Sequence, residues 1–287
     1  MFATRRSWFS PLGALASATV LGVGLLTVAH FAQRSDAAPR LAPLVQPHPS
    51  GGVLTPGADF GFQAPDRTRR PGVATVPVTV RYTFDGGVHQ PITDQRGGFE
   101  LRPLGQNGGT LSLVPQGNGL AVQYPERCTL PRERECPRAI LEGLPDDDLN
   151  PGTRPMRYGA SILMTHSDLA DGANVLQKGY SVGGRSQFKL QVDHRQGHPS
   201  CVIASRTRIY RAEPAVDVAD GAWHELECSR TGNRLELAVD GVPRASVAVP
   251  PDLSIANAEP LRVGGKGPNR GNDQFAGQID NVFLTIL

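Results

Sequence analysis

Apolar and polar residues alternate along much of the chain after residue 73. The first such run places Val76, Val78, Val80, Tyr82 and Phe84 two positions apart. This period of two is typical of a strand that buries one face and leaves the other polar. The spacing recurs at Leu111 and Leu113, at Ile162 and Met164, at Phe188, Leu190 and Val192, and at Leu235, Leu237 and Val239. The pattern predicts roughly 12 to 14 short strands.

Turn signals separate these segments, and no helical pattern after residue 73 exceeds two turns. Asp240-Gly241 follows one strand segment and is a favoured pair at a hairpin tip. The segment Pro137–Leu144 has the composition of a short helix at most. The chain shows no internal repeat and no second linker. We therefore expect residues 73–287 to form one all-β domain, a two-sheet antiparallel β-sandwich of the jelly-roll type.

The first 37 residues have the pattern of an export signal. Arg5 and Arg6 precede an apolar run that ends near Ala32, and small residues follow at Ala37 and Ala38. This order is typical of a secretory signal peptide cleaved near Ala37 or Ala38. The paired arginines also resemble a twin-arginine signal. Because an apolar run of about 20 residues can cross a bilayer, an uncleaved membrane anchor remains the alternative.

Residues 38–72 differ in composition from both neighbours. They are rich in Pro, Gly, Ala and Arg and show no apolar periodicity, which predicts a flexible linker. The charge of the chain then indicates little about partners. It carries 29 Lys and Arg against 27 Asp and Glu, and removing residues 1–37 leaves 26 of each. A neutral chain lacks the basic footprint of a nucleic-acid-binding protein.

Four cysteines in an exported chain favour two disulfides, because the extracytoplasmic compartment is oxidising. Cys128 and Cys136 lie in one short predicted loop, and Cys201 and Cys228 lie on two neighbouring predicted strands. We therefore expect the pairs 128–136 and 201–228. A zinc site would compete for the same thiols, but the chain contains no Cys-x-x-Cys pair.

The C-terminal half contains a succession of short motifs: Asn174–Gly179, Gln187–Val192, Gly221–His224, Leu235–Gly241, Leu261–Gly265 and Phe275–Val282. In this order and spacing they resemble the laminin-G-like and concanavalin A-like domains of exported bacterial proteins. Tyr82–Asp85 and Thr93–Gly97 are similar to the opening strand and the following loop of that family, with Arg96 in place of the usual serine. The resemblance covers about residues 76–287 and implies a lectin-like sandwich.

The resemblance also implies a calcium site. In that family an acidic residue near the first strand meets one on the last strand, and here Asp85, Asp94 and Asp280 occupy those places. Calcium takes six to eight oxygen ligands, so carboxylates in this arrangement suit it. The alternative is that Asp280 accepts hydrogen bonds from turn amides and that Asp85 is a turn residue before Gly86.

Other polar clusters are weaker candidates for chemistry. Asp146-Asp147-Asp148 lacks the spaced oxygens of an EF-hand loop and is expected to be solvated. His194 and His198 have a spacing that would suit zinc on a helix, but Gly197 and Pro199 argue against a helix there.

No catalytic motif lies in the context that its chemistry needs. Gly179–Gly183 reads Gly-x-Ser-x-Gly, but another strand follows instead of the helix of a nucleophile elbow. The Glu-x-Asp-x-x-Glu motif of glucanases with this fold is absent, and Glu225 and Glu227 are predicted to face outward on one strand. We therefore do not expect an enzyme.

These observations predict an exported recognition module that binds a glycan or an extracellular protein. The loop tyrosines Tyr158, Tyr180 and Tyr210 are candidate sugar contacts. The alternative is a glycoside hydrolase or lyase of the same fold, which would place a carboxylate pair such as Glu225 and Glu227 on a concave sheet face. A purely structural envelope domain held by an uncleaved anchor is the third possibility.

Overall fold

The computed structural model describes residues 52–54, 71–87, 92–170, 172–182, 186–193 and 196–287. The predicted export signal and most of the predicted linker lie outside these residues. The described residues all fall in the unit Pro47–Leu287, which is one of two compact units of the chain. None of the helices in the described ranges is both long enough and apolar enough to span a bilayer.

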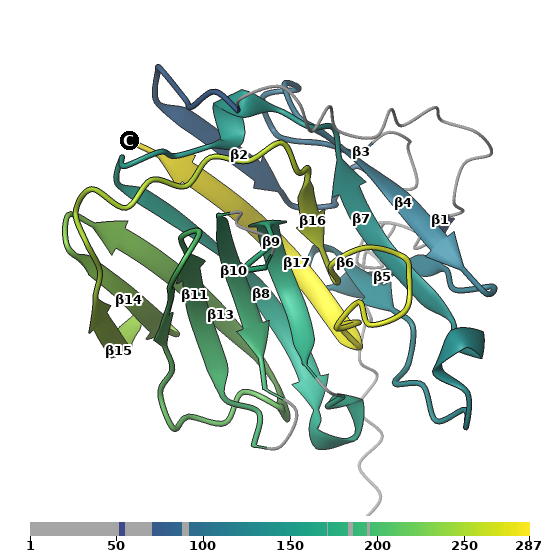
Figure 1. Cartoon of the computed structure of the whole chain (residues 1–287). Coiled ribbons are helices and arrows are strands. Elements are labelled where there is room, and N and C mark those ends of the chain that lie inside the picture. The colour runs from purple at the N-terminus through teal and green to yellow at the C-terminus, as the bar shows by residue number, and fades with distance from the viewer. Residues whose placement is uncertain (1–51, 55–70, 88–91, 171, 183–185, 194–195) are drawn as a thin grey trace, which may run out of the picture. The chain divides into compact units, whose positions relative to one another are not determined.

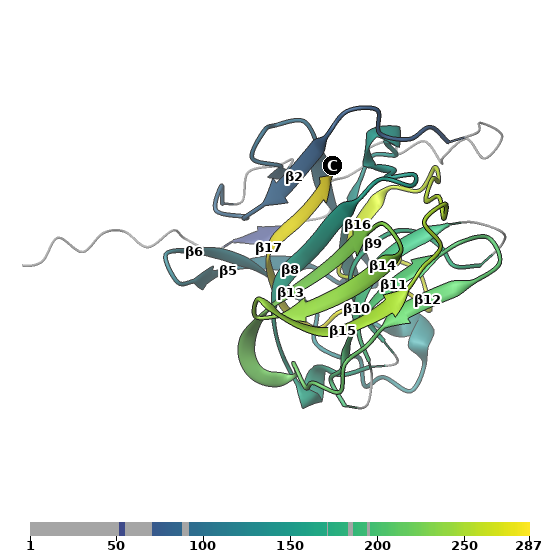
Figure 2. The same ribbon diagram turned by 90° about the vertical axis from the view of Figure 1, so that its left-hand side faces the viewer.

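The described residues form two antiparallel β-sheets, as predicted (Figure 1). The nine-stranded sheet has the order β1-β5-β6-β17-β8-β13-β14-β15, and β2 also pairs with β17. Figure 2 shows β17, β8, β13, β14 and β15 side by side. Its strands are β1 (Val53–Leu54), β2 (Val78–Tyr82), β5 (Leu111–Gln116), β6 (Gly119–Tyr124), β8 (Met156–Thr165), β13 (Asp220–Thr231), β14 (Arg234–Val239), β15 (Val242–Ala248) and β17 (Gly277–Ile286).

The eight-stranded sheet has the order β12-β11-β10-β9-β16-β7-β4-β3. Its strands are β3 (Ile92–Thr93), β4 (Glu100–Gln106), β7 (Arg138–Gly143), β9 (Ala173–Gly179), β10 (Gln187–Val192), β11 (Pro199–Ala204), β12 (Ile209–Ala212) and β16 (Leu261–Val263). Helical structure in the described ranges consists of three short 3₁₀ segments, η1 (Glu133–Glu135), η2 (Asp147–Leu149) and η3 (His166–Asp168).

The alternating pattern places the core as the sequence predicts. In β13, Leu226 and Cys228 belong to the buried hydrophobic core, whereas Glu225 and Glu227, which alternate with them, do not. Phe188, Leu190 and Val192 of β10 reach the same core from the other sheet. Because the side-chain period of a strand is two, each sheet presents one apolar face to the core and one polar face outward.

Three details differ from the expectation or extend it. Pro137–Leu144 forms strand β7 and not a helix, because Ala139 and Leu141 enter the core while the segment pairs with β4 and β16. Strands of two or three residues, such as β1 and β16, are too short to give an alternating pattern, so the described residues contain more strands than the 12 to 14 expected. The predicted linker contains β1, which pairs with β5.

Both predicted disulfides are present, Cys128–Cys136 and Cys201–Cys228. Cys201 lies on β11 and Cys228 on β13, so these strands are neighbours across the core and not within one sheet. The predicted hairpin tip is confirmed: Asp240 and Gly241 connect β14 to β15 with φ angles of 53° and 73°. Positive φ at both central residues is what a type I′ turn requires.

Candidate functional site

A row of polar side chains crosses the outer face of the eight-stranded sheet. Strand register pairs Arg102 with Glu142, Glu142 with Arg262, Arg262 with Gln177, and Gln177 with Lys189. Directly opposite residues on neighbouring strands lie on the same face of a sheet. We call these five residues the polar ladder. They come from β4, β7, β16, β9 and β10, and their neighbours Leu141, Leu176, Leu190 and Val263 point into the core.

Ion pairs and hydrogen bonds hold the ladder in one arrangement. The Arg262 guanidinium donates to Glu142 and, over 3.2 Å, to Glu259 Oε2. Burial lowers the pKa of Arg262, but the carboxylates of Glu142 and Glu259 outweigh it, so the pKa is raised and the guanidinium stays charged. Gln177 Nε2 donates to Gly179 O, and Gln187 Nε2 lies 3.4 Å from Gln177 Oε1. Buried charges held in this way are fixed donors and acceptors.

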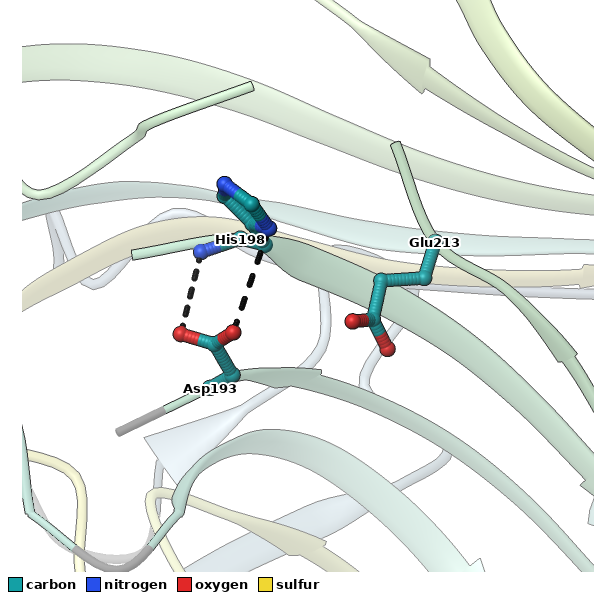
Figure 3. A group of neighbouring side chains, drawn as sticks. All are labelled: Asp193, His198 and Glu213. Carbon is teal, nitrogen blue, oxygen red and sulfur yellow. Dashed lines mark hydrogen bonds and ion pairs between the residues drawn. The ribbon is translucent and has the colours of Figure 1, made fainter. Parts of the chain in front are cut away.

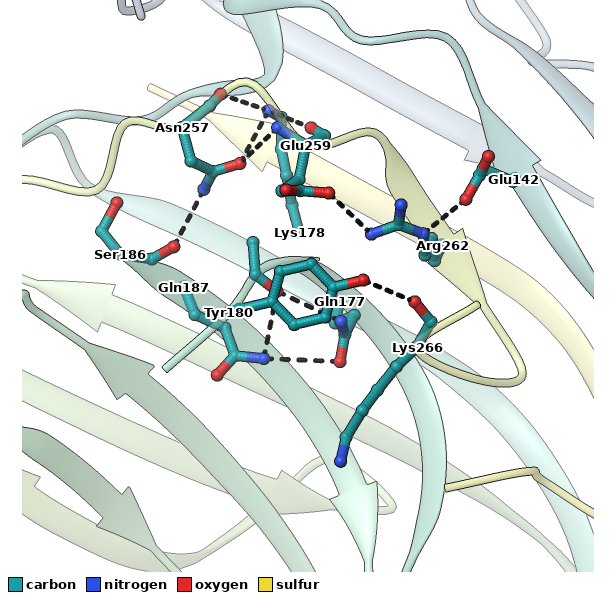
Figure 4. Close-up of polar contacts among 11 residues, drawn as sticks. Glu142, Gln177, Lys178, Tyr180, Ser186, Gln187, Asn257, Glu259, Arg262 and Lys266 are labelled. Carbon is teal, nitrogen blue, oxygen red and sulfur yellow. Dashed lines mark hydrogen bonds and ion pairs between the residues drawn. The ribbon is translucent and has the colours of Figure 1, made fainter. Parts of the chain in front are cut away.

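Tyr180 is the aromatic side chain of this region. Its ring centroid lies 5.5 Å from the guanidinium carbon of Arg262, and its hydroxyl donates to Lys266 O over 2.9 Å. Figure 4 shows the ring between Gln187 and Arg262. Gly179 lets the chain turn out of β9 directly before Tyr180: its φ is +88°, and a Cβ there would lie 2.1 Å from Ser186 O. An arginine on an aromatic face is a cation–π contact, which fixes the ring plane.

The loop between β16 and β17 supplies a second charged group beside the ladder. Lys189 Nζ donates to Asp273 Oδ2 over 3.0 Å, and Lys266 Nζ lies 2.6 Å from the same oxygen. Burial lowers the pKa of Lys189, and Asp273 acts in the opposite direction. Asp273 O also accepts from Asn174 N, which ties the loop to β9.

The next row of the same face contains buried polar atoms without partners. Register pairs Gln191 with Asn174 on one side and with Ser200 on the other. Asn174 and Ser200 are 0% and 1% exposed, and within the described residues neither the Asn174 amide atoms nor Ser200 Oγ have a hydrogen-bond partner. Buried polar groups are almost always satisfied, so such atoms point to a bound water, ion or ligand.

The three predicted calcium ligands do not form one ligand group. Asp94 Oδ1 accepts from the backbone N–H groups of Gly98 and Phe99, and its Oδ2 accepts from Arg96 N, so it organises its own loop. Asp85 Oδ1 accepts from Leu120 N. Asp280 is buried, and burial together with the Asp85 charge raises its pKa to about 6. Asp85 and Asp280 are therefore close enough to interact, as the resemblance implies, whereas Asp94 does not join a group with ligand atoms within 4.8 Å of one another.

Three other predicted residues lie on strands of the nine-stranded sheet, namely Glu225, Glu227 and Tyr158. Glu225 and Glu227 face outward and line a hollow on the nine-stranded sheet with Arg157 and Phe283, and Arg157 Nε donates to Glu227 over 2.7 Å. Tyr158 is a buried core residue on β8 and not a loop residue.

The Gly-x-Ser-x-Gly segment follows β9 without a helix in its described part, residues 179–182, as expected. Asp146 accepts from Asp148 N at the start of η2. His194 lies outside the described residues, and His198 lies beside Asp193 and Glu213.

The comparisons with known proteins agree with this architecture. Residues 161–284 match the family model of the Concanavalin A-like lectin/glucanases superfamily. The predicted resemblance is confirmed. The matched region of this concanavalin A-like domain begins in β8 and ends in β17, so it includes the Gln177, Lys189 and Arg262 positions of the ladder. No curated protein matches the sequence.

Solved structures are similar to the concanavalin A-like domain in fold. The binding domain of Paraclostridial Mosquitocidal Protein 1 matches with a TM-score of 0.53 and 11% identity, over 72% of this chain and 48% of that chain. Domain 4 of AbnA, a GH43 extracellular arabinanase from Geobacillus stearothermophilus solved in complex with arabinotriose, matches with a TM-score of 0.53 and 16% identity, over 76% of this chain and 94% of that domain.

The binding domain of Botulinum Neurotoxin DC in complex with SialylT matches with a TM-score of 0.50 and 10% identity. The alignment covers 71% of this chain and 47% of the neurotoxin chain. The concanavalin A-like domain therefore spans about half the length of the two toxin chains and nearly all of the arabinanase domain.

Proposed function

We propose that this chain is an exported recognition module that binds a carbohydrate on the outer face of its eight-stranded sheet. The observation that carries the proposal is the Tyr180 ring held on Arg262 beside the polar ladder. A sugar has apolar C–H faces and hydroxyl groups that both donate and accept. The half-buried Tyr180 ring offers an apolar face and the half-buried Lys266 ammonium offers a donor, while the buried Arg262, Gln177 and Glu142 hold this region in place. Together they match both properties.

The similar structures support a binding role over a catalytic one. Two of the similar structures are toxin binding domains, one of them in complex with SialylT, and the third is an arabinanase domain in complex with arabinotriose. Their sequence identity of 10 to 16% establishes likeness of fold, and function belongs to sites and not to folds. The ladder and Tyr180 are therefore what the proposal depends on.

Export is supported by the two disulfides together with the signal pattern of the sequence. Disulfides of this kind persist in oxidising compartments outside the cytosol. A recognition module that reaches a glycan surface would act there.

Calcium remains part of the proposal in a reduced form. Asp85 and Asp280 lie near each other, and their mutual repulsion raises the pKa of Asp280 beyond what burial does alone. A cation between them would remove this repulsion, so these two residues fit a calcium site. Asp94 is not part of this pair, because it organises its own loop through three backbone N–H groups and its oxygens do not join a ligand group with those of Asp85 and Asp280. Asp280 itself accepts from Asn281 N and Nδ2, so a cation would share its oxygens with these two donors. Calcium would supply structural stability to the strand end near Asp280.

A hydrolase remains the second candidate, because Glu225 and Glu227 line a surface hollow on the nine-stranded sheet. The Arg157–Glu227 ion pair argues against it: Glu227 receives two hydrogen bonds from the guanidinium and raises the pKa of Arg157. A glycosidase needs one carboxyl group that is free to carry a proton to the leaving oxygen, and the Arg157 guanidinium engages both oxygens of Glu227.

The test is glycan-array screening of the full purified chain, followed by titration of the bound glycans. We expect binding that Tyr180→Ala weakens at least about 10-fold, the loss of one good stacking contact. Tyr210→Ala is the matched control: Tyr210 was predicted to be a loop residue that contacts sugar, but it lies on β12 of the same sheet and packs against the core. No glycan binding, with capture of a protein ligand instead, or equal affinity of Tyr180→Ala and wild type, would overturn the carbohydrate proposal.

A further inference from the structure

One end of the eight-stranded sheet brings together a histidine and two carboxylates. One ligand atom each from Asp193, His198 and Glu213 lies within 4.8 Å of the other two. Asp193 follows β10, His198 precedes β11 and Glu213 follows β12, so three strand ends contribute one residue each. Figure 3 shows the three side chains turned toward one another. Within the described residues this is the one such group of three His, Cys, Asp or Glu side chains.

The β10–β11 hairpin places the first two residues opposite each other. Asp193 N donates to His198 O over 2.9 Å, and Asp193 Oδ1 accepts from the N–H groups of Gln196 and His198. His198 Nδ1 lies 4.0 Å from Asp193 Oδ2. The side chains of Asp193 and His198 are 24% and 19% exposed, so they are reachable from solvent but largely packed. The hairpin thus holds the imidazole and the carboxylate near each other without a direct hydrogen bond between them.

Strand β12 brings the third residue. Cys201 pairs with Ala212 in the antiparallel β11–β12 pair. Ser200 precedes Cys201 and Glu213 follows Ala212, so the same register brings these two residues opposite each other. Alternation along β11 and β12 places both on the outer face, because Cys201 and Ala212 belong to the core. Glu213 Oε2 accepts from Arg211 over 2.8 Å, which leaves the group with two carboxylates and one guanidinium beside the imidazole.

Ser200 supplies an independent sign of a bound species at this place. The Ser200 hydroxyl is buried and has no hydrogen-bond partner within the described residues. Ser200 lies two residues after His198 in the chain and is adjacent in register to Gln191 and Glu213. Leaving a buried hydroxyl unsatisfied costs about 1 to 3 kcal/mol. A water held by a cation would satisfy it.

We propose that Asp193, His198 and Glu213 bind a divalent transition-metal cation, with Zn²⁺ the best match. One imidazole nitrogen and two carboxylate oxygens are ligands that zinc accepts, and three protein ligands leave a position for water. Calcium prefers a larger set of ligands that are all oxygen atoms, so an imidazole nitrogen does not suit it. Ser200 would hydrogen-bond the metal-bound water from outside the ligand set, the position that orients such a water.

This site is separate from the calcium pair Asp85 and Asp280 and does not depend on the carbohydrate proposal. It lies on the same outer face as the polar ladder, since Lys189, Gln191 and Asp193 follow one another at alternate positions of β10 and beyond. A metal here would add a fixed positive charge to the end of that face.

The test is titration of the chelator-treated full chain with ZnCl₂, followed by calorimetry and by competition with a chromophoric chelator. We expect the wild-type chain to bind one equivalent of Zn²⁺. In His198→Gln and in Glu213→Gln this binding should be lost, or the affinity of the chain for Zn²⁺ should fall at least about 10-fold. Asp193→Asn is the sharper variant, because the remaining carbonyl oxygen still accepts the Gln196 and His198 amides while the charge is removed. Ser200→Ala should weaken binding less than any ligand variant.

His224→Gln is the matched control, since His224 lies on β13 of the nine-stranded sheet, where it pairs with Asp220 and Asp240, and its loss should leave the affinity unchanged. Circular dichroism and melting temperatures of the variants establish that each one is folded. Zinc binding that is the same in wild type and His198→Gln, no zinc binding by the wild-type chain, or binding of Ca²⁺ in preference to Zn²⁺ at this site would overturn the proposal. Loss of glycan binding without loss of zinc would affect the carbohydrate proposal alone.

Discussion

Cys201 on β11 is bonded to Cys228 on β13, so this disulfide joins the two sheets through the core. Both residues are fully buried. The other disulfide, Cys128–Cys136, closes a loop of 8 residues outside the sheets, whereas the inter-sheet bond closes 27. The two bonds therefore constrain different parts of the unfolded chain.

Removing the inter-sheet disulfide should cost more stability than removing the loop disulfide. In the chain-entropy relation, the 27-residue separation corresponds to about 3.5 kcal/mol and the 8-residue separation to about 2.5 kcal/mol. The double variant Cys201→Ala and Cys228→Ala should therefore unfold at lower urea than Cys128→Ala and Cys136→Ala. Equal midpoints for the two double variants would contradict this ordering.

Lys178 should make the stability of the domain rise with pH above neutrality. Burial lowers its pKa to about 7, against the attraction of Asp147, Asp146 and Glu259, while a lysine in the unfolded chain ionises near 10.4. Between these values the unfolded chain binds a proton that the folded chain does not, so the free energy of unfolding increases with pH. We expect a gain of about 1 to 2 kcal/mol from pH 7 to pH 9, measured by urea denaturation.

Lys178→Met should remove this pH dependence and lower stability at every pH. Lys178 Nζ donates to Asn257 O over 3.0 Å and to Glu259 O over 2.7 Å, and those carbonyl groups would lose a partner at a cost of about 1 to 3 kcal/mol. Lys266→Met, at a half-buried lysine, is the control and should retain the wild-type slope. A slope from pH 7 to pH 9 that is identical in Lys178→Met and wild type would show that another group is responsible.

Asp280 should reduce stability as the pH rises from about 4 to 6. Its folded pKa, raised to about 6 by burial and by Asp85, lies above the value near 3.9 of an unfolded aspartate. The favourable contribution of the protonated form is complete below pH 4 and is lost as the pH rises through 6. Asp280→Asn removes this titration but also replaces an oxygen that accepts from Asn281 with an amide nitrogen, a loss that is the same at every pH. Relative to wild type, the variant should therefore gain about 1 to 3 kcal/mol between pH 4 and pH 7. A stability difference between variant and wild type that is the same at pH 4 and pH 7 without calcium would contradict this prediction.

Calcium should reverse the effect of that substitution. If Asp85 and Asp280 hold the ion, millimolar CaCl₂ raises the melting temperature of wild type at pH 7 and raises that of Asp280→Asn much less. The comparison is made by differential scanning calorimetry after chelator treatment. Asp252→Asn, an exposed carboxylate outside these contacts, is the control and should respond as wild type does. An unchanged wild-type melting temperature in calcium would remove the calcium site from the proposed function.

Asp94→Asn should be destabilising at pH 7. Both oxygens of Asp94 accept backbone N–H groups, at 2.7 Å from Gly98 and 3.2 Å from Arg96, and an amide nitrogen in place of one oxygen cannot accept. We expect a loss of about 1 to 3 kcal/mol by urea denaturation, with no change in calcium response. A calcium response that depends on Asp94 would restore the predicted set of three ligands.

The sequence by itself determined the strands, the sandwich and the disulfides. Alternation such as Phe188, Leu190 and Val192 fixes which side chains reach the core, because the strand period is two, and Asp240-Gly241 fixes a hairpin tip through its positive φ angles. These are local properties, readable without knowing which strands pair. The short strand β7 was missed because its burial comes from pairing with β4 and β16 and not from its own pattern.

Only the tertiary structure decided the candidate sites. The polar ladder takes one residue from each of five strands, β4, β7, β9, β10 and β16, of which only β9 and β10 are consecutive in the chain, and register alone aligns these residues. In the same way, Asp193 and Glu213 meet His198 because β12 pairs with β11. The sequence spacing made His198 a candidate metal ligand but did not predict its carboxylate neighbours. Pairing between strands that are distant in the sequence determines which polar side chains share a face.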